Sequence, residues 1–187
     1  IPNERKSHQI PTPLVGGLAI FSGLVMAFLL TMADGAALHL REILSFFGGG
    51  LLLVTVGVID DFIELSPLAR FAAQIVAALL MIFGAGVVLT DLGGMTLSGR
   101  LLTMGVFAVP FTVFATLGVI NALNMCDGLD GLSGSLSLVS LTGLFLAAWL
   151  WGDVADVILL PLLGSAVVGF LLFNLRLPGR ERASIFM

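Results

Sequence analysis

The chain has 187 residues, of which 58% are hydrophobic and only 11% are charged, and its formal net charge is −4. A soluble domain carries about 25% charged and 45–50% apolar residues, so the composition excludes a soluble globular domain and indicates an integral membrane protein. The single cysteine, Cys126, excludes a disulfide bond within the chain.

Residues 1–13 are polar and contain three prolines, so we expect extended or turn-like backbone there. Six apolar stretches follow, each close to the ~20 residues that a bilayer-spanning helix needs. They cover residues 14–32, 43–59, 68–89, 101–122, 135–151 and 157–175. We therefore predict an all-α, polytopic transmembrane helical bundle with about six spans, forming one domain over residues 1–187.

Basic residues set the expected orientation of these spans, because cytoplasmic loops of membrane proteins carry an excess of Lys and Arg. Alternating spans place the N-terminal segment, residues 60–67, residues 123–134 and the tail 176–187 on one side. The basic residues of that side are Arg5, Lys6, Arg70, Arg176, Arg180 and Arg182. Only Arg41 and Arg100 fall on the other side. We therefore predict that the first side is cytoplasmic.

The same arrangement of spans also places five acidic residues of the inner loops on this predicted side. They are Asp60, Asp61, Glu64, Asp127 and Asp130. The hydropathy pattern does not require this agreement, so it is the main reason to expect the active face to be cytoplasmic. On the opposite side, residues 90–100 can form a small hairpin, to which we attach no function.

Asp60 and Asp61 directly follow an apolar run, so we expect them at the membrane interface. If the helix continues through Glu64, that residue shares a face with both aspartates. Carboxylates this close repel each other, and a divalent cation or a shared proton relieves the repulsion. Mg²⁺ takes oxygen ligands and completes its shell with water and substrate phosphates. A solvated acidic helix end is the alternative interpretation.

Amide and carboxylate side chains recur every third residue between positions 121 and 130. They are Asn121, Asn124, Asp127 and Asp130. Gly128 and Gly131 indicate that the helix breaks or opens there, which lets backbone approach a ligand. Polar groups at this density beside a membrane are costly unless they bind an ion or a polar substrate. We interpret the stretch as a cation and phosphate site, with a tight interhelical loop as the alternative.

Two basic groups flank the apolar spans. The first is Arg5, Lys6 and His8, and the second is Arg176, Arg180 and Arg182. Juxtamembrane basic residues often only anchor a protein to anionic lipid. Their alternative role is to bind the phosphates of a substrate.

Three motifs resemble those of the polyprenyl-phosphate N-acetylhexosamine-1-phosphate transferases (glycosyltransferase family 4). They are residues 2–8 (Pro-Asn-Glu-Arg-Lys-Ser-His) with 11–17 (Pro-Thr-Pro-Leu-Val-Gly-Gly), residues 60–64 (Asp-Asp-Phe-Ile-Glu), and residues 121–132 (Asn-Ala-Leu-Asn-Met-Cys-Asp-Gly-Leu-Asp-Gly-Leu). They occur in the family's order over the whole chain, and the third is highly specific. The chain most resembles the bacterial undecaprenyl-phosphate N-acetylglucosamine-1-phosphate transferases.

The resemblance implies that the phosphate of a membrane polyprenol attacks the β-phosphate of a UDP-sugar. The products are a polyprenyl-diphosphate-sugar and UMP, at the start of a cell-envelope glycan such as O-antigen or cell wall. Mg²⁺, with Mn²⁺ as an alternative ion, neutralises the diphosphate charge in such reactions. A two-step route through a covalent aspartyl intermediate is left open.

The resemblance also implies residue roles. Asp60, as activator of the lipid phosphate, Asp61 and Asp127 are the expected catalytic residues. The metal ligands are expected to be Asn124 and Asp61. The residues expected to bind substrate are Arg5, Lys6, His8, Asn121 and Asp130.

The expected partners are a UDP-sugar donor, the undecaprenyl phosphate acceptor and membrane lipid, with no nucleic acid, and a homodimer is left open. The expected location is the bacterial cytoplasmic (inner) membrane. Glu64 stands where the family often has Asp. The family continues after Met187 with Gly-Asp, whose aspartate binds magnesium, and has a transmembrane helix before Ile1. We therefore expect a domain truncated at both ends, and predict that the 187-residue chain alone releases no UMP.

Other functions are kept as alternatives. Within the same family, the alternative is a phospho-N-acetylmuramoyl-pentapeptide transferase, although such relatives usually lack the Pro-Asn-x-Arg-Lys-x-His opening. From another class, the alternative is half of a cation-coupled transporter, whose acids would form an ion path. A structural membrane scaffold has no need for adjacent carboxylates.

Overall fold

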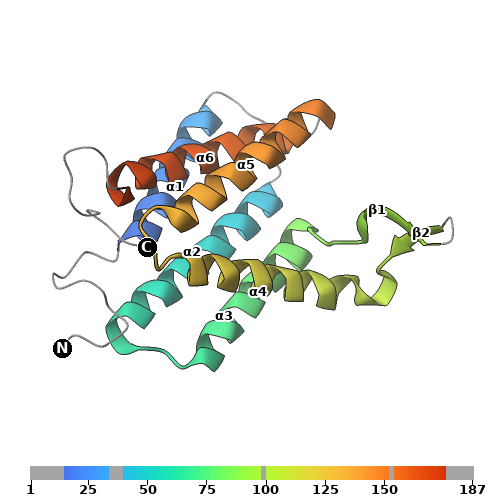
Figure 1. The fold of residues 1–187 in the computed structure, drawn as a ribbon, viewed down its shortest axis with the longest axis horizontal. Helices are drawn as coiled ribbons and strands as arrows, with labels where there is room; N and C mark the ends of the chain where they lie inside the picture. Colours follow the sequence, from blue (N-terminus) through green and yellow to red (C-terminus); the bar gives the residue numbers. More distant parts are fainter. Residues whose placement is uncertain (1–14, 34–39, 98–99, 152–153, 176–187) are drawn as a thin grey trace. The chain divides into compact units, whose positions relative to one another are not determined.

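The computed structural model describes residues 15–33, 40–97, 100–151 and 154–175 of the chain. It is almost entirely helical, which confirms the predicted all-α membrane bundle (Figure 1). The helices are α1 (Gly16–Ala33), α2 (Leu40–Ile63), α3 (Pro67–Leu79), the π-helical turn η1 (Leu80–Gly84), the 3-10 turn η2 (Gly105–Phe107), α4 (Ala108–Cys126), α5 (Leu132–Trp151) and α6 (Val154–Asn174). Two strands, β1 (Asp91–Leu97) and β2 (Arg100–Thr103), complete the described elements.

Each predicted span corresponds to a helix in the described part of the chain. Within the described residues, four helices are long and apolar enough to cross a membrane: Leu40–Ile63, Pro67–Gly84, Gly105–Cys126 and Leu132–Leu150. Gly16–Thr31 and Ile158–Asn174 are shorter apolar helices. The fourth span begins later than predicted, because residues 100–103 belong to β2.

The strands β1 and β2 pair antiparallel, with Asp91 opposite Thr103 and Thr96 opposite Leu101. The hairpin expected in this region is therefore confirmed. It follows α3 and η1 and precedes η2 and α4. The backbone N–H of Leu89 donates to Thr112 Oγ1 at 2.9 Å, which connects the segment before the β1–β2 hairpin to α4.

The chain divides into two compact units. The first comprises Ile1–Asp34 and Asn124–Met187 and contains α1, α5 and α6. The second comprises Gly35–Leu123 and contains α2, α3, the hairpin and most of α4.

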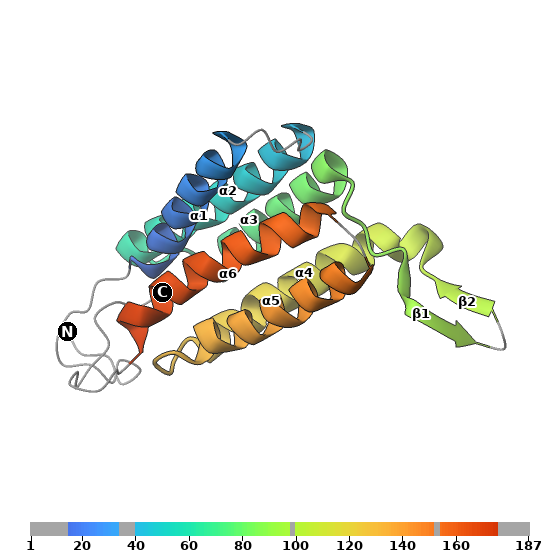
Figure 2. The same ribbon diagram turned by 90° about the horizontal axis from the view of Figure 1, so that it is seen from above.

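In the first unit, α6 packs against both α5 and α1, and α5 and α6 run side by side (Figure 2). The buried centre consists of Val167, Phe170 and Leu171. A Cβ added at Gly134 on α5 would lie 2.7 Å from Leu171 Cδ2. Glycine at this position therefore allows the beginning of α5 to approach α6 closely.

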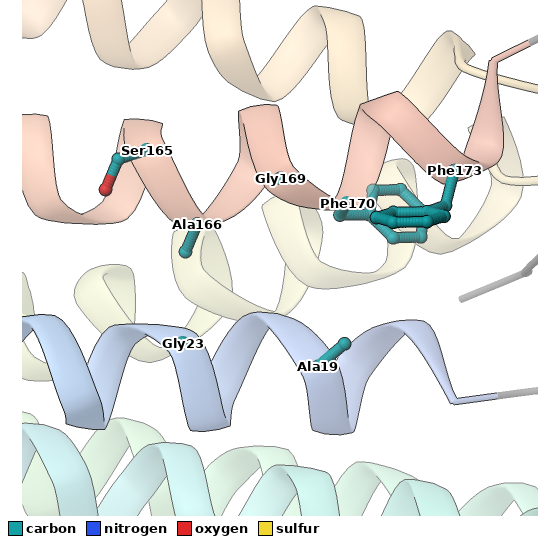
Figure 3. A pocket seen from close by; sticks show the side chains of 7 residues that line it. All are labelled: Ala19, Gly23, Ser165, Ala166, Gly169, Phe170 and Phe173. Carbon is teal, nitrogen blue, oxygen red and sulfur yellow. The ribbon is translucent and has the colours of Figure 1, made fainter.

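A groove of about 340 Å³ lies between α1 and α6 in the same unit (Figure 3). Its lining residues are Ala19, Gly23, Ser165, Ala166, Gly169, Phe170 and Phe173. Small side chains on both helices leave this space, and two phenylalanines close the end nearest the C-terminus of α6 (Figure 3).

In the second unit, α2 and α3 form an antiparallel helical hairpin. Gly49 on α2 faces α3, since a Cβ at this position would lie 3.6 Å from the carbonyl oxygen of Ala77. At the far end, Arg41 Nη2 donates to the carbonyl oxygen of Phe83 at 2.5 Å. These contacts fix the separation of the two helices, and with it the turn that carries the first acidic motif.

Candidate active site

Asp60 lies in the last turn of α2, and its side chain is 24% exposed. Its Oδ1 accepts a hydrogen bond from the backbone N–H of Leu65 at 2.7 Å. Its Oδ2 lies 3.3 Å from Nη1 of Arg70 on α3. The carboxylate is thus held from two directions, by the backbone of the α2–α3 turn and by a guanidinium.

Glu64 does not share a helical face with Asp60 and Asp61, because α2 does not continue to Glu64. The α-helix ends at Ile63, and Glu64 has a φ of 47°, in the left-handed region. Ser66 then caps α3, with its Oγ accepting from the backbone N–H of Ala69 at 3.3 Å. Pro67 disfavours helical backbone at the residue before it, so α2 cannot run directly into α3.

Arg70 and Gln74, one turn apart on α3, are site residues that the sequence interpretation missed. Arg70 pairs with Asp60 of the second motif. Gln74 Oε1 accepts a hydrogen bond from Asn121 Nδ2 of the third motif at 2.8 Å. The signal in the sequence was a basic and an amide residue at i, i+4 in an otherwise apolar helix.

Asn121 Nδ2 also donates to the carbonyl oxygen of Leu117, at 2.8 Å. The amide nitrogen of Asn121 therefore donates to two acceptors. Asn124 follows one turn later on α4 and has an exposed surface. Both amides of the third motif thus lie near the C-terminal end of α4.

The helix breaks between the amides and the carboxylates of the third motif, as the glycines predicted. The helix α4 ends at Cys126 and α5 begins at Leu132. Gly131 has a φ of 77°, a conformation that side chains strongly disfavour. Asp127 and Asp130 therefore lie in a connection, and a single helical stripe of all four polar residues is not formed.

Asp127 is half-buried in this connection, and Ser133 Oγ donates to its Oδ1 at 2.6 Å. Burial raises the pKa of Asp127 above its ordinary value of 3.8, and the hydrogen bond from Ser133 acts in the opposite direction. Burial is the larger effect, because it disfavours the charged form. A carboxylate with a raised pKa is a common feature of functional sites.

Asn174, the last residue of α6, is a further residue that the sequence interpretation missed. Its side chain is 2% exposed, and its Oδ1 accepts from the backbone N–H of Gly131 at 2.6 Å. The available signal was an asparagine at the end of an apolar span, where an unbonded amide would be costly.

The remaining predicted residues divide into two groups. Asp61 is exposed in the last turn of α2, and Asp130 is half-exposed in the α4–α5 connection. The basic residues predicted to bind substrate lie outside the described residues. They are Arg5, Lys6 and His8, and the same holds for Arg176, Arg180 and Arg182.

The donors predicted to bind magnesium fit that ion in kind, since carboxylate and amide oxygens are the ligands it prefers. Among the residues that the structure describes, however, no group of three or more His, Cys, Asp or Glu side chains gathers as a metal site. Asp61 and Asn124 belong to different units. Asp61 and Asn124 would each supply one oxygen ligand to the ion.

Comparison with known proteins places these features in a family. The chain is 36% identical over 186 residues to the undecaprenyl-phosphate alpha-N-acetylglucosaminyl 1-phosphate transferase of Yersinia pestis. The identity is 33% with the protein of the same name from Escherichia coli K12 and 34% with that from Haemophilus influenzae.

These alignments cover 100% of this chain and 49%, 49% and 51% of the three relatives. The chain thus spans about half the length of the curated relatives it matches. No solved structure matches it. Residues 43–187, which contain both acidic motifs and the α4–α5 connection, match the family described as Glycosyl transferase family 4. The chain belongs to glycosyl transferase family 4.

Proposed function

We propose that the protein transfers a sugar 1-phosphate, N-acetylglucosamine 1-phosphate, from a UDP-sugar to undecaprenyl phosphate. The observation that carries the proposal is the similarity, over the entire chain, to relatives whose names give undecaprenyl phosphate and N-acetylglucosaminyl 1-phosphate. The UDP donor is what the resemblance of the motifs implies. An oxygen of the lipid phosphate forms a bond to the β-phosphorus of the donor. The bond from that phosphorus to the oxygen shared with the α-phosphate breaks, and UMP leaves.

Asp60 is the proposed activator of the lipid phosphate, with Asp61 beside it. Positioning is the main task in phosphoryl transfer, because the reaction needs the attacking and leaving oxygens roughly in line. The hydrogen bond from Leu65 and the ion pair with Arg70 hold the Asp60 carboxylate in one orientation. This support comes from within the α2–α3 hairpin itself.

Asp127 is the proposed catalytic residue of the α4–α5 connection, with Asp130 and Asn121 binding substrate. The raised pKa of Asp127 supports a role that involves a proton or a nearby phosphate. Arg5, Lys6 and His8 remain the proposed phosphate-binding residues of the N-terminal segment.

Magnesium, or manganese in its place, is the proposed cofactor. When bound, such an ion neutralises charge on a diphosphate. The support is the oxygen chemistry of Asp61 and Asn124, because magnesium often uses one or two protein ligands and completes its shell with water and substrate phosphates. Chelation with EDTA is expected to abolish transfer, and added Mg²⁺ or Mn²⁺ to restore it; undiminished transfer in EDTA contradicts the proposal.

The proposed location is the bacterial inner membrane, with the active face cytoplasmic. A cation transporter is not favoured, because transporter sites lie near the bilayer midplane. Asp60 instead lies in the last turn of α2, and Asp127 lies in a connection between helices.

The test uses membranes that contain the full-length protein, supplied with undecaprenyl phosphate and a panel of UDP-sugars. The lipid product is identified by mass, and UMP release is measured. Asp60→Asn and Asp127→Asn are each expected to lower transfer by about a hundredfold or more, the usual contribution of a catalytic acid or base. Asp91→Asn, the same substitution in the hairpin, serves as the matched control and is expected to leave transfer unchanged. Undiminished transfer by both site variants overturns the assignment.

A further inference from the structure

Asn174 combines deep burial with a contact that links two distant parts of the chain. It is 2% exposed, and its Oδ1 lies 2.6 Å from the backbone nitrogen of Gly131, 43 positions earlier. Burying an amide is costly unless its polar atoms are bonded. The hydrogen bond to Gly131 therefore compensates for placing an asparagine at this position.

Leu175, the residue that follows Asn174, also packs against Gly131. The side chain of Leu175 occupies the space that a Cβ on Gly131 would take. The carbonyl oxygen of Gly131 accepts from the backbone N–H of Ser135 at 2.9 Å, so Gly131 also begins the hydrogen-bonding of α5. Asn174 and Leu175 thus fix the point at which the α4–α5 connection becomes helix.

The start of α5 in turn carries the group that holds Asp127. Ser133 lies in the first turn of α5, is 3% exposed, and donates its hydroxyl to Asp127 Oδ1 at 2.6 Å. A buried hydroxyl in the first turn of a helix has little freedom of its own. The position of Gly131 therefore determines where the Ser133 hydroxyl lies and which way the Asp127 carboxylate points.

We propose that Asn174 is a positioning residue for the transfer reaction: by holding the Gly131 N–H it sets the start of α5 and, through Ser133, the orientation of Asp127. The effect on the reaction rests on the proposed function, in which Asp127 is catalytic. The structural effect, in which Asn174 of α6 fixes the α4–α5 connection, does not rest on the proposed function.

The experiment compares three substitutions in the full-length protein. Asn174→Leu keeps the approximate size and removes the acceptor, whereas Asn174→Asp keeps an acceptor oxygen. Ser165→Ala is the matched control, because Ser165 lies on the same helix and its Oγ donates only within α6, to the carbonyl oxygen of Leu162 at 2.8 Å. Hydrogen exchange of residues 124–134 and the kcat and KM of transfer are measured for each.

We expect Asn174→Leu to raise exchange in residues 124–134, because it leaves the buried N–H of Gly131 without its acceptor. It is also expected to lower kcat by about tenfold or more, because the Asp127 carboxylate is no longer held in its productive position. Asn174→Asp is expected to stay closer to the wild type, and Ser165→Ala to match it. Unchanged exchange and kcat in Asn174→Leu overturn the proposal. If Asn174→Leu raises exchange throughout α5 and α6, the result for Asn174→Asp is decisive. Full loss of protection of residues 124–134 in Asn174→Asp also overturns the proposal.

A double-mutant cycle separates positioning from a general loss of stability. Ser133→Ala alone is expected to lower kcat, and it is expected to add little once Asn174→Leu is present, because both act on Asp127 through one chain of contacts. Fully additive losses overturn the proposed route. If the wild type shows no transfer, the proposed function is wrong. The hydrogen-exchange data then still test whether Asn174 fixes the α4–α5 connection.

Discussion

Asp127, the proposed catalytic residue of the α4–α5 connection, opposes the stability of the fold at neutral pH. Its pKa is raised above 3.8 by burial, so folding favours its protonated form. Between pH 3.8 and the higher pKa of the folded state, the folded protein retains a proton that the unfolded chain has lost. The free energy of unfolding therefore falls as pH rises through this window, and the contribution is fully present only below pH 3.8.

Asp127→Asn is accordingly expected to raise the unfolding temperature at neutral pH, by about 2 °C, while lowering transfer. The asparagine oxygen can still accept from Ser133, so the hydrogen bond at this position is kept. Thermal unfolding in detergent and metal-free buffer, recorded across pH, tests this. The difference between variant and wild type should disappear toward low pH; a difference that is constant or reversed contradicts the assignment.

At the scale of elements, the α2–α3 hairpin depends on close approach at one glycine. A Cβ at Gly49 would already lie 3.6 Å from the carbonyl oxygen of Ala77, whereas one at Gly48 would meet nothing within 4 Å. Added side-chain volume at position 49 must therefore separate the helices, and with them Asp60 from Arg70.

Gly49→Leu is expected to destabilise the protein by about 1–3 kcal/mol, the usual effect of overpacking a close contact. Gly48→Leu, the same change one residue earlier, is the control and is expected to be nearly neutral. Thermal unfolding and transfer activity are both measured. Equal effects of the two substitutions would show that the contact of Gly49 with Ala77 does not set the helix separation.

Residues of the sequence motifs are bonded to side chains that lie outside the motifs, on other helices. Apolar composition and segment length were enough to place six apolar helices, and Gly128 and Gly131 were enough to predict the break before α5. Arg70, Gln74 and Asn174 were not predicted as site residues, because their roles depend on which atoms they meet across helices. The shared face of Asp60, Asp61 and Glu64 required α2 to continue to Glu64. The helix ends at Ile63 instead, because Ser66 and Pro67 begin α3.

At the scale of the whole molecule, the number of membrane crossings sets which loops share a side. With alternating spans, the α2–α3 turn and the α4–α5 connection fall on one side, and the β1–β2 hairpin falls on the other. The excess of Lys and Arg predicts that the first side is cytoplasmic.

Single cysteines in a Cys126→Ser background test this arrangement. Ser66→Cys and Leu129→Cys are expected to react with a membrane-impermeant maleimide only from the cytoplasmic side, and Met95→Cys only from the opposite side. All three native residues are exposed, so access within the chain does not limit labelling. Labelling of Ser66→Cys and Met95→Cys from the same side contradicts the predicted topology.

The sequence by itself determined the membrane class, the helical spans and the break at residues 127–131, because these depend on composition, length and local backbone preference. It also carried the family resemblance, since motif identity is a property of the sequence. Only the tertiary structure decided that Asp60 is paired with Arg70, that Asn121 is bonded to Gln74, and that buried Asn174 holds Gly131. These contacts join residues between 10 and 47 positions apart. Such partners are selected by helix packing, which local sequence patterns do not encode.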